Sequence, residues 1–391
     1  MNERPPGDLH AAIDPGALVE IARHLIQVPS EQSALFEDDP AVQGFVRDTV
    51  APILHHAGYP GRFDAMGNLL VEAGPRDSGP STMVMAYAMT HPRAGMADPF
   101  SGSIVESPEG PSLRGRGASE QKGALAAGII AFLAAQKLAP HRRRVLAVST
   151  AGETGSHRAA ESMLAALETI PSLCIVAIGT GGRISLANKG RLDVHVDIRG
   201  VSSHSSTPWA SIDAIAGARA VMDRLSRLDL GTRRHPLLGE ATLSFTSIRS
   251  FPDATHTIQD HVRITCDRRL LPGDDAEPAL AAIREAVQDM TPWTVEVRPG
   301  VLQYPAEIPT DGNFMRAARD GAGLVGLPAP ETFASHGCVD TGYLARHGCE
   351  SAMWGPGDQR MWHTAEERLP VADLVACARG YLGFLVSERP G

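Results

Sequence analysis

Three segments of this sequence carry side chains whose types suit a metal ion. Glu120 lies in ASEQKG (118–123), Glu153 lies in AGETG (151–155) and His363 lies in MWHTA (361–365). Carboxylate oxygens and imidazole nitrogens are both ligands of divalent ions such as Zn²⁺ and Mn²⁺. Each of these side chains lies where a predicted strand ends and a loop or a helix begins. The segments are far apart in the chain, so a metal site requires a fold that brings them together.

The elements that must position these residues alternate between helices and apolar strands. Leu18, Ala22 and Leu25 recur at helical spacing, and residues 82–88 form an apolar run that suits a buried strand. The interval 89–117 carries Gly, Pro and Asp and is predicted to be a loop. This alternation predicts an α/β fold with a largely parallel sheet. The expected helices are 15–29, 41–57, 123–137, 157–167, 313–319 and 371–386, and the expected strands are 68–73, 82–88, 144–150, 173–178 and 351–354.

A different rhythm begins at Arg191. Residues 191–198 alternate polar and apolar side chains with a period of two, which is typical of a sheet with one face in water. We therefore predict that residues 191–301 form a smaller α+β domain, inserted into an α/β domain made of residues 1–190 and 302–391. Its further expected strands are 240–248, 261–266 and 294–298, and its expected helices are 213–225 and 277–290.

The composition excludes several classes of protein. The formal net charge is -9 and the longest basic run is Arg142-Arg143-Arg144, whereas phosphate binding needs a concentrated basic surface. The first residues are polar, and no apolar run is long enough to cross a bilayer. The 5 cysteines are scattered and show no CxxC spacing. We therefore expect a cytoplasmic protein with reduced thiols that binds neither nucleic acid nor membranes.

Six motifs, in this order, resemble those of one enzyme family, the metallopeptidases and deacylases that include carboxypeptidase G, aminoacylase, acetylornithine deacetylase and succinyl-diaminopimelate desuccinylase. The resemblance implies a zinc-peptidase-like catalytic α/β domain and an inserted lid domain that usually forms the dimer. It also implies two metal ions bridged by one carboxylate, with a glutamate as general base. The motifs are LRGRGASEQKG (113–123), NKG (188–190), GVSSHSSTP (200–208), DRRLLPG (267–273), CVDT (338–341), and GPGD with HTAEE (355–358 and 363–367).

The resemblance also exposes losses at the family's metal site. The family's first H-x-D motif corresponds to Ala88-Met89-Thr90, so its histidine and aspartate are absent. The position of the family's general base is occupied by Gly152, and no acidic residue lies near Gly179, where the next acidic ligand is expected. The family's ligands for the other ion are all present, as Glu120, Glu153 and His363. The resemblance therefore implies a degenerate site that binds one divalent ion per chain, with Zn²⁺ or Mn²⁺ as the expected metal.

With Gly152 at the base position, another group must accept the proton. His91, just after the depleted first motif, is the first candidate for this catalytic role, and it is alternatively a replacement ligand. His157 and His336 are further candidates. For each of these histidines the alternative is a polar or capping role, because the chain contains 15 histidines.

Three residues fall at family positions associated with the substrate. Arg269 matches a residue that binds a substrate carboxylate, which a guanidinium can hold bidentately; the alternative is an ion pair with Asp267 or a nearby acid. His204 matches a lid histidine that reaches across the dimer to stabilise the oxyanion; the alternative is an exposed turn histidine. Asp340 falls in a loop near the family's site, where a substrate-binding and a structural role are both open.

The expected function is metal-dependent hydrolysis of a C–N bond in a small molecule that carries a carboxylate, by an amidohydrolase or aminohydrolase. One alternative is an aromatic aminohydrolase similar to 5-nitroanthranilate deaminase. Another is a dipeptidase or N-acyl amino acid deacylase with a rebuilt site. A third is a non-catalytic protein that binds carboxylates. The family resemblance implies a homodimer or a higher homo-oligomer.

Overall fold

The computed structural model describes residues 9–33, 37–76, 79, 81–151 and 155–387. The chain forms two compact units. Unit 1 comprises Met1–Leu186, Glu307–Ala334 and Val339–Gly391, and unit 2 comprises Ala187–Ala306 and Ser335–Cys338. The sequence placed the corresponding boundaries at 190/191 and 301/302. We describe each unit by itself.

The core of unit 1 is a six-stranded sheet with the order β1-β2-β6-β3-β7-β19. The strands β3, β6, β7 and β19 run parallel, and β2 is antiparallel to β6. The prediction of a largely parallel sheet is therefore confirmed. Strands β3, β6 and β7 are buried along their whole length, which is why they read as continuous apolar runs. The bounds are β1 Arg62–Phe63, β2 Leu69–Ala73, β3 Thr82–Tyr87, β6 Arg144–Ser149, β7 Leu173–Ala177 and β19 Glu350–Trp354.

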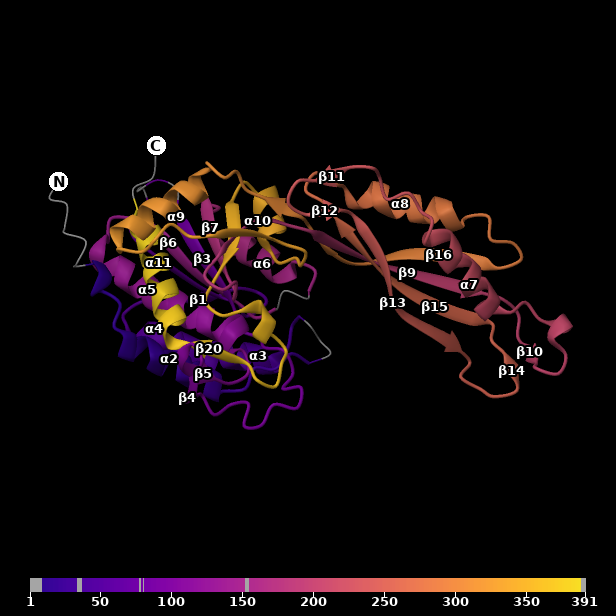
Figure 1. The fold of residues 1–391 in the computed structure, drawn as a ribbon, viewed down its shortest axis with the longest axis horizontal. Coiled ribbons are helices and arrows are strands. Elements are labelled where there is room, and N and C mark those ends of the chain that lie inside the picture. Colours follow the sequence, from indigo (N-terminus) through magenta and orange to yellow (C-terminus); the bar gives the residue numbers. More distant parts are fainter. Residues whose placement is uncertain (1–8, 34–36, 77–78, 80, 152–154, 388–391) are drawn as a thin grey trace. The chain divides into compact units, whose positions relative to one another are not determined.

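Helices cover both faces of this sheet (Figure 1). Alternate residues of β3 separate the two faces, since Val84 belongs to a core built with α2, α5, α9 and α11, whereas Met85 belongs to a core built with α6 and α10. The expected helix 41–57 is interrupted by a π-helical turn at Val46–Val50. The bounds are α2 Pro15–Gln27, α3 Pro40–Phe45, α4 Ala51–His56, α5 Gly123–Leu138, α6 Arg158–Ala166, α9 Asn313–Leu324, α10 Thr341–Arg346 and α11 Val371–Val386.

The prediction of a loop over residues 89–117 was wrong. This interval contains a hairpin of β4 (Ser103–Ser107) and β5 (Gly110–Arg114), and β5 also pairs with β20 (Arg368–Pro370) in an antiparallel three-stranded sheet. The two hairpin strands are short and partly exposed, and they contain Ser, Gly and Pro, so they lack an apolar strand pattern. The pairing of Leu113 with Leu369 brings the segment before Glu120 beside the segment after His363.

Unit 2 contains an antiparallel four-stranded sheet with the order β13-β15-β9-β16, and α7 and α8 pack on one of its faces (Figure 1). Strand β15 alternates buried and half-buried residues throughout, as the period of two predicts. The bounds are β9 Gly190–Arg199, α7 Ala214–Leu225, β13 Thr242–Phe251, β15 His261–Leu270, α8 Ala276–Val287 and β16 Thr294–Gln303.

Short strands complete the described structure. They form three small sheets, with the orders β17-β8-β18, β10-β14 and β11-β12. None of the helices in the described ranges combines the length and the apolar character that a membrane span requires. The bounds are β8 Ile184–Asn188, β10 Ser203–His204, β11 Arg234–His235, β12 Gly239–Glu240, β14 Thr257–Ile258, β17 Ala306–Glu307 and β18 Thr332–Ser335.

Candidate metal centre

Glu120 lies in a π-helical turn, Ala118–Lys122, that leads directly into α5. The turn begins at Gly117, whose φ of 79° is in the left-handed region that glycine adopts without strain. A Cβ atom at Gly117 would lie 2.4 Å from Thr90 Cγ2, so the close packing also requires glycine. Glu120 itself is completely buried. The local sequence therefore holds a carboxylate in a buried, tightly packed turn.

Glu367 fixes the backbone of this turn. Its Oε1 accepts hydrogen bonds from the backbone N–H groups of Ser119 (3.1 Å) and Glu120 (3.2 Å). Its Oε2 accepts from the N–H of Gly117 (3.0 Å) and from Arg116 Nη1 (2.7 Å). Both side chains of the ion pair are fully buried. Sequence reasoning recorded Glu367 only as part of a motif; the signal for its role was its place four residues after His363.

His363 lies beside Glu120. Its Nε2 is 3.0 Å from Glu120 Oε1, although the two residues are 243 positions apart. Two ligands of a tetrahedral zinc ion, each about 2.0–2.1 Å from the metal, are separated by roughly 3.3 Å. The observed separation of the oxygen and the nitrogen is close to that value, so the pair fits two positions of such an ion. The third expected ligand, Glu153, lies outside the described residues.

The described residues alone supply an incomplete ligand set. Within the ranges that the structure describes, no group of three or more His, Cys, Asp and Glu side chains could hold a metal ion. His91 is nevertheless close to the pair, because its ring stacks on His363 with a centroid distance of 3.8 Å and an interplanar angle of 18°. The structure thus brings together Glu120, His363 and His91. Whether His91 acts as a base or as a ligand stays a prediction.

The positions at which the sequence predicted missing metal ligands are closely packed. Gly179 donates its N–H to Glu120 O at 2.8 Å, and a Cβ atom there would lie 2.0 Å from Ser119 O. The neighbouring Thr180 donates its hydroxyl to Arg183 O at 2.5 Å. Ala88 and Thr90 are both fully buried. Gly152 lies outside the described residues.

Asp340 belongs to a buried hydrogen-bonded group in unit 1. Its Oδ1 is 2.6 Å from His157 Nδ1, and its Oδ2 accepts from the Tyr87 hydroxyl at 2.8 Å. The Asp340 N–H donates back to the Tyr87 oxygen at 3.2 Å. These are the contacts expected of a structural role. A contact of Asp340 with substrate stays a prediction.

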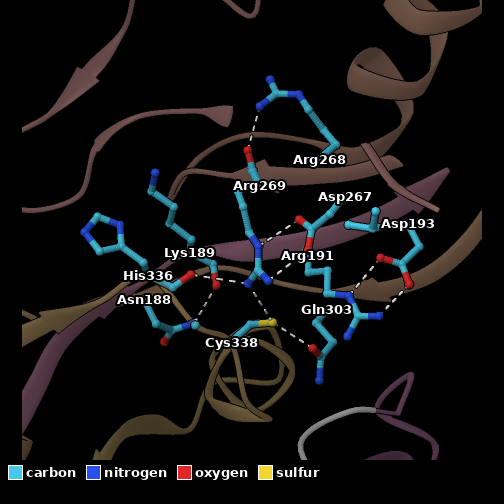
Figure 2. Close-up of polar contacts among 12 residues, drawn as sticks. Asn188, Lys189, Arg191, Asp193, Asp267, Arg268, Arg269, Gln303, His336 and Cys338 are labelled. Atoms are coloured by element: carbon cyan, nitrogen blue, oxygen red, sulfur yellow. Dashed lines mark hydrogen bonds and ion pairs between the residues drawn. The ribbon is translucent and has the colours of Figure 1, made fainter. Parts of the chain in front are cut away.

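In unit 2, Arg269 forms a bidentate ion pair with Asp267 (Figure 2). Arg269 Nε and Nη2 lie 2.8 Å and 2.9 Å from the two carboxylate oxygens. Its Nη1 donates to His336 O at 3.2 Å and approaches Cys338 Sγ at 3.6 Å. This ion pair is the alternative that the sequence raised. Among the described residues, these Nη1 contacts are to a neutral carbonyl oxygen and a thiol. The binding of a substrate carboxylate by Arg269 stays a prediction.

His204 is an exposed residue of β10 in unit 2. Its Nδ1 accepts the Ser206 N–H at 3.2 Å and lies 2.7 Å from the Ser206 hydroxyl oxygen. A neutral imidazole that accepts at Nδ1 carries its proton at Nε2. The local turn therefore favours the tautomer that presents an N–H donor at Nε2.

Known proteins resemble this chain in sequence and in fold. The family model described as Peptidase family M20/M25/M40 matches residues 90–387. An acetylornithine deacetylase from Myxococcus xanthus is 30% identical over 274 residues, which cover 68% of this chain and 70% of the relative. The M20 family metallo-carboxypeptidase Sso-CP2 from Sulfolobus solfataricus has a TM-score of 0.75 at 15% identity, and the match covers 95% of this chain and 99% of that chain. The Bacillus subtilis protein YXEP, described as a dinuclear metal binding peptidase, has a TM-score of 0.68 at 14% identity, and the match covers 97% of this chain and 98% of that chain.

These matches confirm the family that the motifs suggested. The prediction that the site is degenerate is not borne out by these matches. The relatives include deacylases and peptidases, which hydrolyse amide or peptide C–N bonds of small substrates. The family model spans most of the sequence, and this chain belongs to the M20 family of peptidases, a family of hydrolases that act on such bonds.

Proposed function

We propose that this protein is a metal-dependent amidohydrolase that uses one divalent ion to cleave a C–N bond in a small molecule bearing a carboxylate. The observation that carries the proposal is the buried Glu120 carboxylate beside the His363 imidazole, at 3.0 Å. The turn held by Glu367 keeps this carboxylate in place. The Myxococcus xanthus relative is a deacetylase of an N-acyl amino acid by its name, which supports an N-acyl amino acid as the substrate class.

The chain's own residues take separate roles in this proposal. Glu120, Glu153 and His363 would hold the ion, which supplies Lewis acidity toward the scissile carbonyl. His91, stacked on His363, accepts a proton from the attacking water. His204 presents its Nε2–H to the developing oxyanion.

A carboxylate of the substrate is bound by Arg269. Its Nη1 donates to a backbone carbonyl and a thiol in the described structure, both neutral, so a carboxylate would be a stronger acceptor for the same N–H groups.

We also propose that the chain forms a homo-oligomer through unit 2. Unit 2 exposes several large apolar side chains, and contact between subunits would remove them from water. Size measurement by light scattering tests this, and a monomer at micromolar concentration would contradict it. The side chains are Val201 (51% exposed), Trp209 (81%), Ile215 (49%), Ile248 (55%) and Phe251 (41%).

Metal analysis and a substrate panel test the proposed reaction. We expect about one Zn²⁺ or Mn²⁺ per chain after dialysis, and hydrolysis of N-acyl amino acids with that ion present. His363→Ala should lose both the ion and the activity, whereas His56→Ala, an exposed histidine of α4, should lose neither. Two tightly bound ions would refute the single-ion site. Release of ammonia from aryl amines without amide cleavage would show that the protein is an aminohydrolase and not an amidohydrolase. No turnover of either substrate class would refute the proposal that the protein is an enzyme.

A further inference from the structure

Strand β15 places one charged residue on the face of its sheet that packs against α7 and α8. Arg268 occupies this position and is only 5% exposed. The buried neighbours of Arg268 along this face of β15 are apolar members of the unit 2 core, Val262, Ile264, Cys266 and Leu270. A buried guanidinium costs free energy unless an anion pairs with it, because burial removes the water that stabilises its charge.

The contacts of Arg268 hold its guanidinium in place but do not neutralise it. Its Nη1 donates to the backbone carbonyl of Arg269 at 2.6 Å (Figure 2), and its Nη2 donates to that of Leu230 at 3.3 Å. Among the residues that the structure describes, no carboxylate lies within 4.0 Å of its nitrogens. Burial lowers the pKa of Arg268, and the negative charge of Asp274 opposes this shift.

Arg268 lines a cavity of about 440 Å³ that lies wholly within unit 2. Residues 228–231, residues 273–275 and the first two turns of α8 form its other walls. Sites for small molecules usually measure about 300–1,000 Å³ and combine an apolar lining with a few polar groups. This cavity has the same character, since its apolar lining is made of Leu228, Leu230, Pro278, Ala279 and Ala282.

Helix α8 begins at this cavity. In the described structure its N-cap residue, Asp275, makes no capping hydrogen bond through its side chain. The first N–H groups of a helix have no partner within the helix and carry a partial positive charge. The first turn of α8 and the Arg268 guanidinium therefore border one space, and both favour an anionic group there.

Three aspartates also line the cavity, so a simple anion would match only part of it. Asp274 is already paired with Arg233. Asp229 accepts the Gly231 N–H at 2.8 Å, and both Asp229 and Asp275 are exposed. Within the described ranges, neither of these two carboxylates forms an ion pair. The cavity thus combines one buried positive group with two accessible negative groups, which complements a ligand that carries both charges.

We infer that this cavity of unit 2 is a binding site for an α-amino acid with an aliphatic side chain. The ligand's carboxylate accepts hydrogen bonds from Arg268 at the start of α8. Its ammonium group is bound by Asp229 and Asp275, and its side chain contacts the apolar lining. The site uses none of the residues assigned to the proposed hydrolysis, so failure of either proposal leaves the other unaffected.

Calorimetry with the full-length protein, without added metal, tests this site. The probes are L-leucine, 4-methylpentanoate, which lacks the amino group of leucine, and 3-methylbutylamine, which lacks its carboxylate. Each analogue forfeits one charge-assisted contact. L-leucine should therefore bind about 10- to 100-fold more tightly than either analogue.

Variants assign the binding to the cavity. Arg268→Met should weaken L-leucine by about 10- to 100-fold. The matched control is Arg269→Gln, because Arg269 is the next residue and its side chain lies on the other face of β15; this variant should bind L-leucine like wild type. Asp229→Asn/Asp275→Asn alters only exposed carboxylates, so it keeps the test decisive if Arg268→Met fails to fold. It should weaken L-leucine but not 4-methylpentanoate.

Several results would overturn the inference. One is the absence of L-leucine binding at millimolar concentration, and another is equal binding of L-leucine and either analogue. Binding of L-leucine that survives Arg268→Met, or that is lost in Arg269→Gln, would locate the ligand elsewhere. Unchanged L-leucine affinity in Asp229→Asn/Asp275→Asn would exclude the ammonium contact and with it the amino-acid site.

Discussion

The buried pair of Arg116 and Glu367 offers the sharpest test of how the metal site is built. Glu367 accepts four hydrogen bonds, three from backbone N–H groups of the turn 117–120 and one from the guanidinium. In Glu367→Gln one carboxylate oxygen is replaced by an amide NH₂ group. This group is a donor, so it cannot accept the two hydrogen bonds that the oxygen accepted. At least two of the four bonds are then lost, and the Arg116 charge, which is fully buried, loses its counterion.

Breaking a buried ion pair by removing one partner costs about 3–5 kcal/mol. We therefore expect Glu367→Gln to lower the free energy of unfolding by that amount. Residues that orient metal ligands typically change metal affinity by about 10–100-fold when they are mutated. Because Glu367 holds the Glu120 N–H, the variant should also bind Zn²⁺ more weakly by a factor in that range.

Urea unfolding and competition with a chelator measure the two effects. Glu20→Gln, which removes an exposed ion pair with Arg23 on α2, is the matched control and should cost less than about 1 kcal/mol. Arg116→Met/Glu367→Gln should recover part of the loss, since no buried charge is left unpaired. A Glu367→Gln protein within 1 kcal/mol of wild type, or with unchanged zinc affinity, would show that this anchor does not position Glu120.

Three further variants test other parts of the structure. Burial opposes ionisation of Asp197, but hydrogen bonds from Arg298, His261 and Arg263 outweigh it and lower the pKa of Asp197 well below 3.8. Asp197→Asn should therefore lower the free energy of unfolding, measured with urea at pH 7, by about 2–3 kcal/mol, and this difference from wild type should shrink as the pH falls below about 3.8. Burial lowers the pKa of Lys122 from 10.5 to about 7, so the unfolded chain binds one more proton than the folded chain between pH 7 and pH 10.5. The free energy of unfolding of wild type relative to Lys122→Met should therefore rise with pH across this window, and a difference that stays constant from pH 6 to 10 would contradict this prediction. Gly117→Ala should cost about 1–2 kcal/mol for the positive φ alone and should weaken zinc binding through the displaced turn; unchanged zinc affinity would count against that role of the turn.

The sequence predicted most of the elements because their patterns are strong. The continuous apolar runs of β3, β6 and β7 indicated strands buried on both faces, and the period of two in β9 indicated a sheet with one wet face. The β4–β5 hairpin escaped notice because its short strands are partly exposed and contain Gly and Pro. Its pairing with β20 is a long-range contact, which local pattern does not encode.

The candidate site divides in the same way. Residue types and order in the sequence were enough to select Glu120 and His363 and to indicate the family. Their separation of 3.0 Å, the stacking of His91 on His363 and the anchoring of the turn by Glu367 depend on strands that meet only in the folded chain. The cavity that Arg268 shares with the first turns of α8 likewise exists only in the folded chain. The sequence by itself determined which chemical groups are available, because that information is local; the tertiary structure alone decided which of them meet, because contacts across hundreds of residues are set by packing and pairing.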